Sequence, residues 1–226
     1  MVSALAKTSG NPSGRAVGRH WTPLSRALDL VGDRWTLMIM GELLAEPLRI
    51  RQLTARMPGI APGDLKRLLY DMVARGLVFR RPRELRPRIE YGLTESGREL
   101  LAILEGLSRW GMRRAWSAPG ADEHIEIDML IRQLPLLLDG AQLPSGVIEL
   151  IVERPDDPLR RVMSLDRGKV ALLRKELHSV MPWARLAGDE QSWIAAFGPK
   201  RVRDGLVITG DRGLASALLD ALPHSG

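Results

Sequence analysis

The sequence contains no cysteine, and this absence removes several chemistries at once. Disulfides, thiol-based redox sensing and cysteine-ligated metal sites are all excluded. The four histidines are scattered and show no HxxxH or HExxH spacing of the kind that holds a metal ion. They are His20, His124, His178 and His224. We therefore expect neither a metal site nor a cofactor.

Long apolar runs and phosphate-binding glycine loops are also missing. No apolar stretch reaches the ~18–20 residues of a membrane span, and residues 1–20 have no apolar core of signal-peptide length. The GxGxxG pattern, the GxxxxGK pattern and any Ser-His-Asp spacing are absent. These absences predict a cytoplasmic protein that is neither an enzyme nor membrane-bound. The leader, residues 1–20, is rich in Ser, Gly, Asn and Pro, and we expect it to be disordered.

Positive charge is concentrated in the first half of the chain. Residues 1–118 carry 20 Lys and Arg against 11 Asp and Glu, whereas residues 119–226 carry 13 against 16. A basic half joined to a mildly acidic half predicts that the first half meets a polyanion and the second does not. Charge alone leaves a simpler alternative open, which is a solvated basic surface.

Four short helices are predicted at the start of this basic half. Three of them are expected at 23–31, 34–45 and 50–57, and the second is apolar nearly all round, so it should lie at the domain centre. After the Pro58-Gly59 turn, apolar residues recur at helical spacing from Leu65 to Val73. Arg75-Gly76 should close this fourth helix with a cation and a C′ glycine.

A hairpin rich in arginine follows. Strands are expected at 77–79 and 89–91, and the connection 81–87 contains two prolines, which cannot donate to a ladder, so we expect a loop there. Thr94 should cap one long helix that runs to Trp116. Part of the apolar face of that helix is expected to lie outside the domain, as in a dimer helix.

This order of elements is that of a winged helix-turn-helix, which places one helix in a DNA major groove and a basic hairpin beside it. The outward face of the fourth helix could reach base edges or phosphates, although an ordinary solvated face is the alternative. The adjacent arginines favour DNA, because guanidinium groups suit a narrow minor groove. The candidate DNA-binding residues are Arg49, Gly63, Asp64, Lys66, Arg67, Tyr70, Arg81, Arg83, Arg86 and Arg88.

The second half has a different pattern, after a linker at 117–121. A helix is expected at 125–138 despite Pro135, then strands at 147–152, 159–165 and 169–174 that form an antiparallel meander. Gly188-Asp189 and Gly210-Asp211 each mark a strand, a glycine turn and an Asp-capped helix. The expected fold class is α+β, a winged helix-turn-helix followed by an α+β domain with an antiparallel sheet packed by helices. The domains would span 21–117 and 122–226.

The segment from Trp21 to Arg114 resembles the HxlR family of winged-helix transcriptional regulators, relatives of the MarR type. Three runs carry the resemblance, namely 32–35 (GDRW), 58–60 (PGI) and 91–97 (YGLTESG). The resemblance implies a homodimer on double-stranded, palindromic operator DNA, with the first and last helices in the interface, and a repressor. Thr22 stands where many members have a cysteine. Ala61-Pro62 replaces a common Ser-Pro, and Ala61 cannot cap with its side chain, which costs ~1 kcal/mol relative to serine.

The second half resembles a sterol-carrier-protein-like domain, through the meander and the Gly188-Asp189-x-x-x-Trp193 and Gly205-x-x-x-x-Gly210-Asp211 patterns. That resemblance implies helices packed on a sheet around an apolar tunnel, and a sensor of a hydrophobic small molecule. Two alternatives stay open: the aromatic residues only pack the core, or the domain is an oligomerisation or protein-interaction module. The candidate ligand-binding residues are Trp183, Trp193, Ile194, Phe197, Met163 and Leu173.

Overall fold

The computed structural model describes residues 21–83, 86–120, 123, 125, 127–138, 140–173 and 180–223, with side chains at 83 and 86–88 left out. The leader expected at 1–20 therefore lies outside the described residues. No helix in the described ranges combines the length and the apolar character needed to cross a bilayer.

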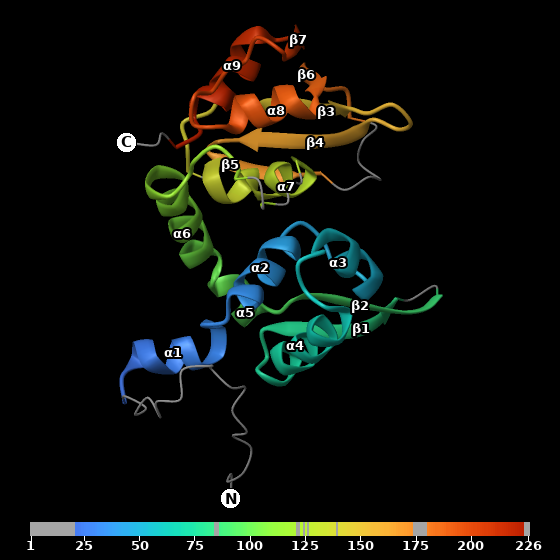
Figure 1. Ribbon diagram of the computed structural model, residues 1–226, viewed down its shortest axis with the longest axis vertical. Helices are drawn as coiled ribbons and strands as arrows, with labels where there is room; N and C mark the ends of the chain where they lie inside the picture. Colours follow the sequence, from blue (N-terminus) through green and yellow to red (C-terminus); the bar gives the residue numbers. More distant parts are fainter. Residues whose placement is uncertain are drawn as a thin grey trace, which may run out of the picture.

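The first half forms short helices and one hairpin, as the sequence predicts (Figure 1). Its helices are α1 (Pro23–Val31), α2 (Arg34–Glu42), α3 (Ile50–Arg56), α4 (Pro62–Ala74), α5 (Glu95–Glu99) and α6 (Leu101–Arg114). Its strands are β1 (Val78–Arg83) and β2 (Arg86–Leu93), which pair antiparallel. Gly76 has φ +73°, a left-handed conformation that glycine adopts without strain, and it ends α4 as expected.

Local capping sets several of these boundaries. The Asp33 carboxylate accepts hydrogen bonds from the backbone N–H groups of Trp35 and Thr36 and so opens α2. Helix α2 ends at Glu42, three residues before the predicted end, because the backbone of Leu43 already leaves the helical conformation. Pro47 follows, and the residue before a proline disfavours the helical conformation.

Two predictions for the first half are wrong. Residues 81–83 and 86–87 lie in paired strands and not in a loop: β1 continues through Pro82 to Arg83 and β2 begins at Arg86, with an irregularity in the register at Pro82/Arg83. Residues 84 and 85 lie outside the described residues. Each strand of a two-stranded sheet has a free edge, so a proline there removes no essential ladder bond.

The expected long helix from Thr94 to Trp116 is also broken, at Leu100, and it ends at Arg114. The break has a packing reason. Helix α5 lies against β2 and α6 lies against α7, so the two segments follow different partners. A side chain at Gly97 would meet the Leu77 carbonyl at 2.1 Å, so this glycine permits the close approach of α5 to the hairpin.

Among its described residues, the second half is a five-stranded sheet with three helices. Its elements are α7 (Ile127–Leu138), β3 (Gly146–Glu153), β4 (Leu159–Asp166), β5 (Lys169–Leu172), β6 (Ala184–Asp189), α8 (Glu190–Phe197), β7 (Val207–Gly210) and α9 (Arg212–Asp220). The strand order is β5-β4-β3-β6-β7. The β3-β4-β5 meander is antiparallel as predicted. The sheet as a whole is mixed rather than antiparallel, because β6 returns to pair parallel with β3. Asp189 and Asp211 cap α8 and α9.

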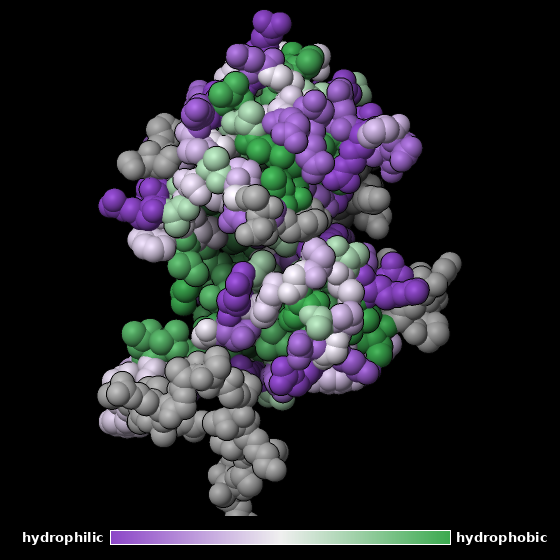
Figure 2. All heavy atoms as spheres, in the orientation of Figure 1, coloured by the Kyte–Doolittle hydropathy of each residue, from purple (hydrophilic) through white to green (hydrophobic). Residues whose placement is uncertain are grey.

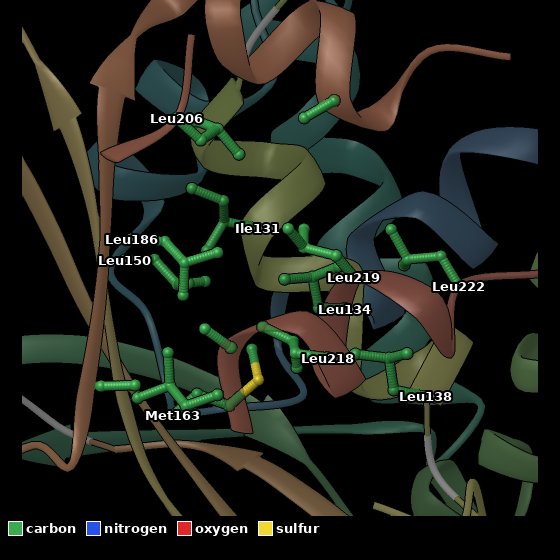
Figure 3. Packing of buried hydrophobic residues seen from close by; sticks show 14 of the residues in the cluster. Ile131, Leu134, Leu138, Leu150, Met163, Leu186, Leu206, Leu218, Leu219 and Leu222 are labelled. Carbon is green, nitrogen blue, oxygen red and sulfur yellow. The ribbon is translucent and has the colours of Figure 1, made fainter. Parts of the chain in front are cut away.

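Helices α7, α8 and α9 contribute to one buried core with the inner face of this sheet. Figure 3 shows Ile131 and Leu134 of α7 close to Leu218 and Leu219 of α9, with Leu150 and Leu186 of the sheet beside them. A second buried core fills the first half and includes Leu136 of α7. Helix α7 therefore contributes side chains to both cores.

Candidate nucleic-acid interface

Helices α3 and α4 meet at the Pro58-Gly59 turn and form a helix-turn-helix. Leu53 anchors α3, and Leu65, Leu69 and Met72 anchor α4, all within the first core. Because the α4 anchors recur every three or four residues, the opposite face of this helix is left to solvent.

The exposed face of α4 carries the polar side chains that the sequence analysis assigns to it. The residues exposed there are Gly63, Asp64, Lys66, Arg67, Tyr70 and Asp71. Within this face, the Arg67 guanidinium donates a hydrogen bond to the Asp64 carboxylate at 2.9 Å. This pair was not anticipated from the sequence, and it aligns the Arg67 side chain toward the N-terminal end of the helix.

The N-terminus of α4 has no side-chain cap, and the acidic side chain in its first turn, Asp64, pairs with Arg67. Ala61 stands at the N-cap and makes no side-chain hydrogen bond to the first turn, and Pro62 follows it. The first-turn N–H groups of this 13-residue helix therefore have no side-chain cap, and they lie at the positive end of the helix dipole. Apart from the adjoining residues and the nearby backbone of α4 itself, no atom lies within 4 Å of where a Cβ of Gly63 would be, so a phosphate or base edge can approach the backbone closely.

Arg49 lies at the other end of the helix-turn-helix, at the N-cap of α3. Its Nε donates to the Gln52 side-chain oxygen at 3.1 Å, and its backbone N–H donates to the same oxygen at 2.9 Å. The side chain is half-buried, so Gln52 holds this guanidinium in place at the start of α3.

The hairpin β1–β2 forms the wing, and it projects beyond α4 in Figure 1. Arg80 and Arg81 are exposed, and the Arg81 guanidinium carbon lies 4.8 Å from the centre of the Phe79 ring. This cation–π contact stiffens an otherwise flexible side chain. The backbone of Arg83 pairs with that of Arg86 near the tip. The side chains of Arg83, Arg86 and Arg88 lie outside the described part of the chain.

Two contacts fix the wing to the rest of the fold. The backbone groups of Leu48 and Tyr91 exchange two hydrogen bonds of 2.8 Å, an isolated bridge that the sequence analysis missed. Such a bridge involves a single residue between α2 and α3, so it leaves no periodic signal in the sequence. The Thr94 hydroxyl accepts from the Gly97 N–H at 3.0 Å and donates to the Gly76 carbonyl at 2.6 Å, which joins α5 to the end of α4.

The residues proposed to bind an apolar ligand do not form one group. Trp193, Phe197 and Met163 are buried in the core, and Ile194 packs against it. The Trp193 ring stacks on Phe197 with centroids 5.4 Å apart, and its Nε1 donates to the Ile151 carbonyl at 2.9 Å. Trp183, by contrast, is 59% exposed just before β6. Leu173 is half-buried at the end of β5.

A cleft of about 260 Å³ lies on the outer face of the sheet, away from α7, α8 and α9. The Glu149 carboxylate accepts hydrogen bonds from Arg160 at 3.2 Å and from Arg185 at 2.9 Å within it. One carboxylate thus offsets part of the charge of two arginines. The lining residues are Glu149, Arg160, Val162, Val180, Met181, Pro182 and Arg185, none of which was proposed from the sequence.

No group of three or more His, Asp or Glu side chains suitable for a metal ion occurs among the residues that the structure describes. The candidate interface consists of the exposed face of α4, with its uncapped N-terminus, beside an arginine-rich wing.

Comparison with known proteins places this first half in a family. Residues 30–118 match the model of the HxlR-like helix-turn-helix family. An HTH-type transcriptional regulator of Mycobacterium tuberculosis is 41% identical over 109 residues, which are 48% of this chain and 64% of that protein. The chain therefore spans slightly less than two thirds of this relative. An HTH-type transcriptional regulator of Halalkalibacterium halodurans is 37% identical over 95 residues, which are 41% of this chain and 83% of that protein.

Solved structures with a similar part include the reduced form of the transcriptional regulator YodB from B. subtilis. It has a TM-score of 0.38 and 26% identity, over 42% of this chain and 96% of that one. The redox regulator HypR in its reduced form has a TM-score of 0.38 and 28% identity, over 40% of this chain and 90% of that one. On the match of residues 30–118 and on the relative that is covered over 83% of its length, the chain belongs to the HxlR-like helix-turn-helix family.

Proposed function

We propose that the protein is a transcriptional regulator that binds double-stranded DNA and has no enzymatic activity. The observation that carries this proposal is the exposed face of α4, with its uncapped N-terminus, beside the arginines of the wing. In a complex, α4 would enter the major groove while the wing lies along the adjacent backbone or minor groove. The relatives named as HTH-type transcriptional regulators support the same function.

We propose further that the protein acts as a homodimer on a palindromic operator. Helix α1 has no buried residue, and apolar side chains of α1 and α6 are exposed instead. The exposed apolar residues are Leu24, Leu28 and Leu30 of α1, Trp21 just before α1, and Ile103, Leu107 and Trp110 of α6. Figure 2 shows hydrophobic surface over α6 and α1 on the same side of the molecule. An apolar surface of this kind favours burial against a second copy.

The dimer helix and the recognition helix are linked within one subunit. The Arg75 guanidinium, at the end of α4, donates a hydrogen bond to the Leu30 carbonyl of α1 at 2.7 Å. A dimer formed through α1 would therefore hold two α4 helices at a defined separation. Repression is the proposed direction of regulation, on the family resemblance alone.

For the second domain, the packing of Trp193 against Phe197 favours a structural role of these side chains over a ligand tunnel between them. Sensing of an apolar molecule at the candidate residues thus gains no support from their positions. We propose that this domain, 122–226, acts through its contact with the helix-turn-helix domain, 21–117.

The salt dependence of binding tests the proposed function. Sequences selected from a random duplex library would be titrated with the protein between 50 and 200 mM salt, with fluorescence anisotropy as the readout. About six phosphate contacts per dimer predict a slope of about −5 in log K against log salt concentration. An Arg203→Met variant, altered in the second domain, should keep this slope. Failure to enrich any sequence, or affinity independent of salt, would contradict the proposal.

A further inference from the structure

A buried carboxylate of the helix-turn-helix is bound by an arginine of the other domain. The Glu42 side chain, at the end of α2, is only 1% exposed. Arg132 of α7 donates to it through Nε at 2.9 Å and through Nη2 at 3.3 Å, and Arg132 is itself only 5% exposed. Two hydrogen bonds from one guanidinium fix both the position and the orientation of a carboxylate.

The same carboxylate also reaches α3. Arg56, in the last turn of α3, lies 3.8 Å from Glu42 and 3.6 Å from Glu46. Burial lowers the pKa of the Arg56 guanidinium from its usual value, and the neighbouring Arg132 lowers it further, while Glu42 acts in the opposite direction. Glu42 thus lies between one cation of its own domain and one of the other.

On the side of Arg132 away from Glu42, further ion pairs connect α7 to the sheet. Arg132 contacts Asp128 one turn earlier on α7, and Arg161 of β4 lies 2.8 Å from the Asp128 carboxylate. A continuous series of charged contacts therefore runs from β4 through α7 to α2 and α3. Removal of one member of a buried ion pair is strongly destabilising, because the other charge stays buried without that partner.

Apolar packing supports the same junction. Leu136 of α7 is buried with the residues of the first core, whereas Ile131 and Leu134 are buried in the second core. In Figure 1, α7 lies between the sheet and α2. A second contact joins the domains, because Trp116 Nε1 donates to the Phe197 carbonyl at 2.8 Å.

We infer that Arg132 is a positioning residue of the DNA-binding domain: it holds α2 and α3 against α7, so that the two domains behave as one body. The inference rests on the proposed function for its consequence. Helix α3 precedes α4 by one short turn, so any shift of α7 changes where α4 is presented to DNA. The second domain can then act on DNA binding without touching DNA.

The test uses the full chain without DNA and follows amide hydrogen exchange by mass spectrometry. In an Arg132→Met variant, exchange in α2 and α3 should be about tenfold faster or more, because Glu42 loses two hydrogen bonds while still buried. Arg203→Met is the matched control, since Arg203 pairs with Asp220 inside the second domain at 2.7 Å, and it should leave α2 and α3 unchanged. Unchanged exchange in α2 and α3 of Arg132→Met would overturn the inference.

A second variant covers the case in which Arg132→Met does not fold. Replacement of both partners, Glu42→Leu with Arg132→Met, removes the buried carboxylate that would otherwise keep the 3.8 Å contact with Arg56 but lose Arg132, while Arg56 keeps Glu46 at 3.6 Å, and it should restore folding. A double variant no better folded than the single one would overturn the inference, because Arg132 would then act only through Asp128.

With the selected operator, Arg132→Met should also bind about fivefold more weakly or worse. If the wild-type chain binds no DNA, the proposed function fails, whereas the exchange result alone decides whether Arg132 couples the domains.

Discussion

Single arginines in the candidate interface are held by different neighbours, and this decides what each can do. Asp64 aligns Arg67 on the face of α4, the Phe79 ring stiffens Arg81, and Gln52 holds Arg49. An aligned guanidinium loses less conformational entropy when it binds a base edge in a defined geometry. Arg67 is therefore the best candidate for base reading, and the wing arginines for contacts to the backbone.

Replacement of Arg67 tests this division at the residue scale. Arg67→Ala should cost about 1–3 kcal/mol on the selected operator and much less on random DNA, so that sequence preference relaxes. Arg83→Ala should weaken binding to both DNAs alike and reduce the salt slope by about 1. Titration of both variants on both DNAs measures the difference.

Equal losses for Arg67→Ala on the two DNAs would assign this residue to phosphate instead. Since the Asp64–Arg67 pair is largely exposed, the variant should fold normally.

At the scale of elements, hydrogen bonds at the base of the wing connect it to its neighbours. The Thr94 hydroxyl caps α5 by accepting from the Gly97 N–H, and it also donates to the Gly76 carbonyl at the end of α4. The Leu48–Tyr91 bridge holds the same hairpin from the other side. These hydrogen bonds add to apolar packing, because Val78, Tyr91 and Leu93 of the wing are buried in the same core as Leu65, Leu69 and Met72 of α4.

Thr94→Val keeps the shape of the side chain and removes its hydroxyl. It should lower the free energy of unfolding by about 1–2 kcal/mol, because the hydrogen bond that caps α5 and the hydrogen bond to the Gly76 carbonyl are lost together. Thr54→Val is the matched control: its hydroxyl donates only to the Ile50 carbonyl within α3, at 2.9 Å, and its loss should cost less than about 0.5 kcal/mol. Urea denaturation with unchanged m-values would measure both. Equal losses in the two variants would remove the special role of Thr94.

At the scale of the whole molecule, an exposed apolar surface and a buried interdomain junction have different consequences. The surface over α1 and α6 is available to a second copy, whereas α7 is already covered on both sides by the two cores. Dimerisation would therefore arise through the first half, and the second domain would influence the dimer through α7.

A charge placed on the α6 surface tests this assembly. Leu107→Glu should give a monomer by light scattering at tens of micromolar and should abolish tight operator binding, because a palindromic site needs two recognition helices. Leu107 is half exposed, so the circular dichroism spectrum should not change. Val207→Glu, on an exposed strand of the second domain, is the control and should keep the wild-type mass. A monomeric wild-type protein with operator DNA present would contradict the dimer.

Local patterns in the sequence determined most helices and their caps. The spacing from Leu65 to Val73 predicted α4, and Thr94, Asp189 and Asp211 predicted the starts of their helices. These signals are readable because a helix and its cap involve residues only three or four positions apart. The outward face of α4 followed from the same periodicity.

Only the tertiary structure decided what is joined over long distances. The extension of the wing through Pro82, the break at Leu100 and the parallel return of β6 beside β3 each depend on a partner far along the chain. The Glu42–Arg132 pair joins residues 90 positions apart. Each side chain alone is compatible with an ordinary surface charge, and only packing of α7 against α2 removes both from water. The sequence by itself determined a helix-turn-helix with an arginine-rich wing, whereas only the tertiary structure decided that α7 packs against it through Arg132 and Leu136, because these contacts join residues far apart in the chain.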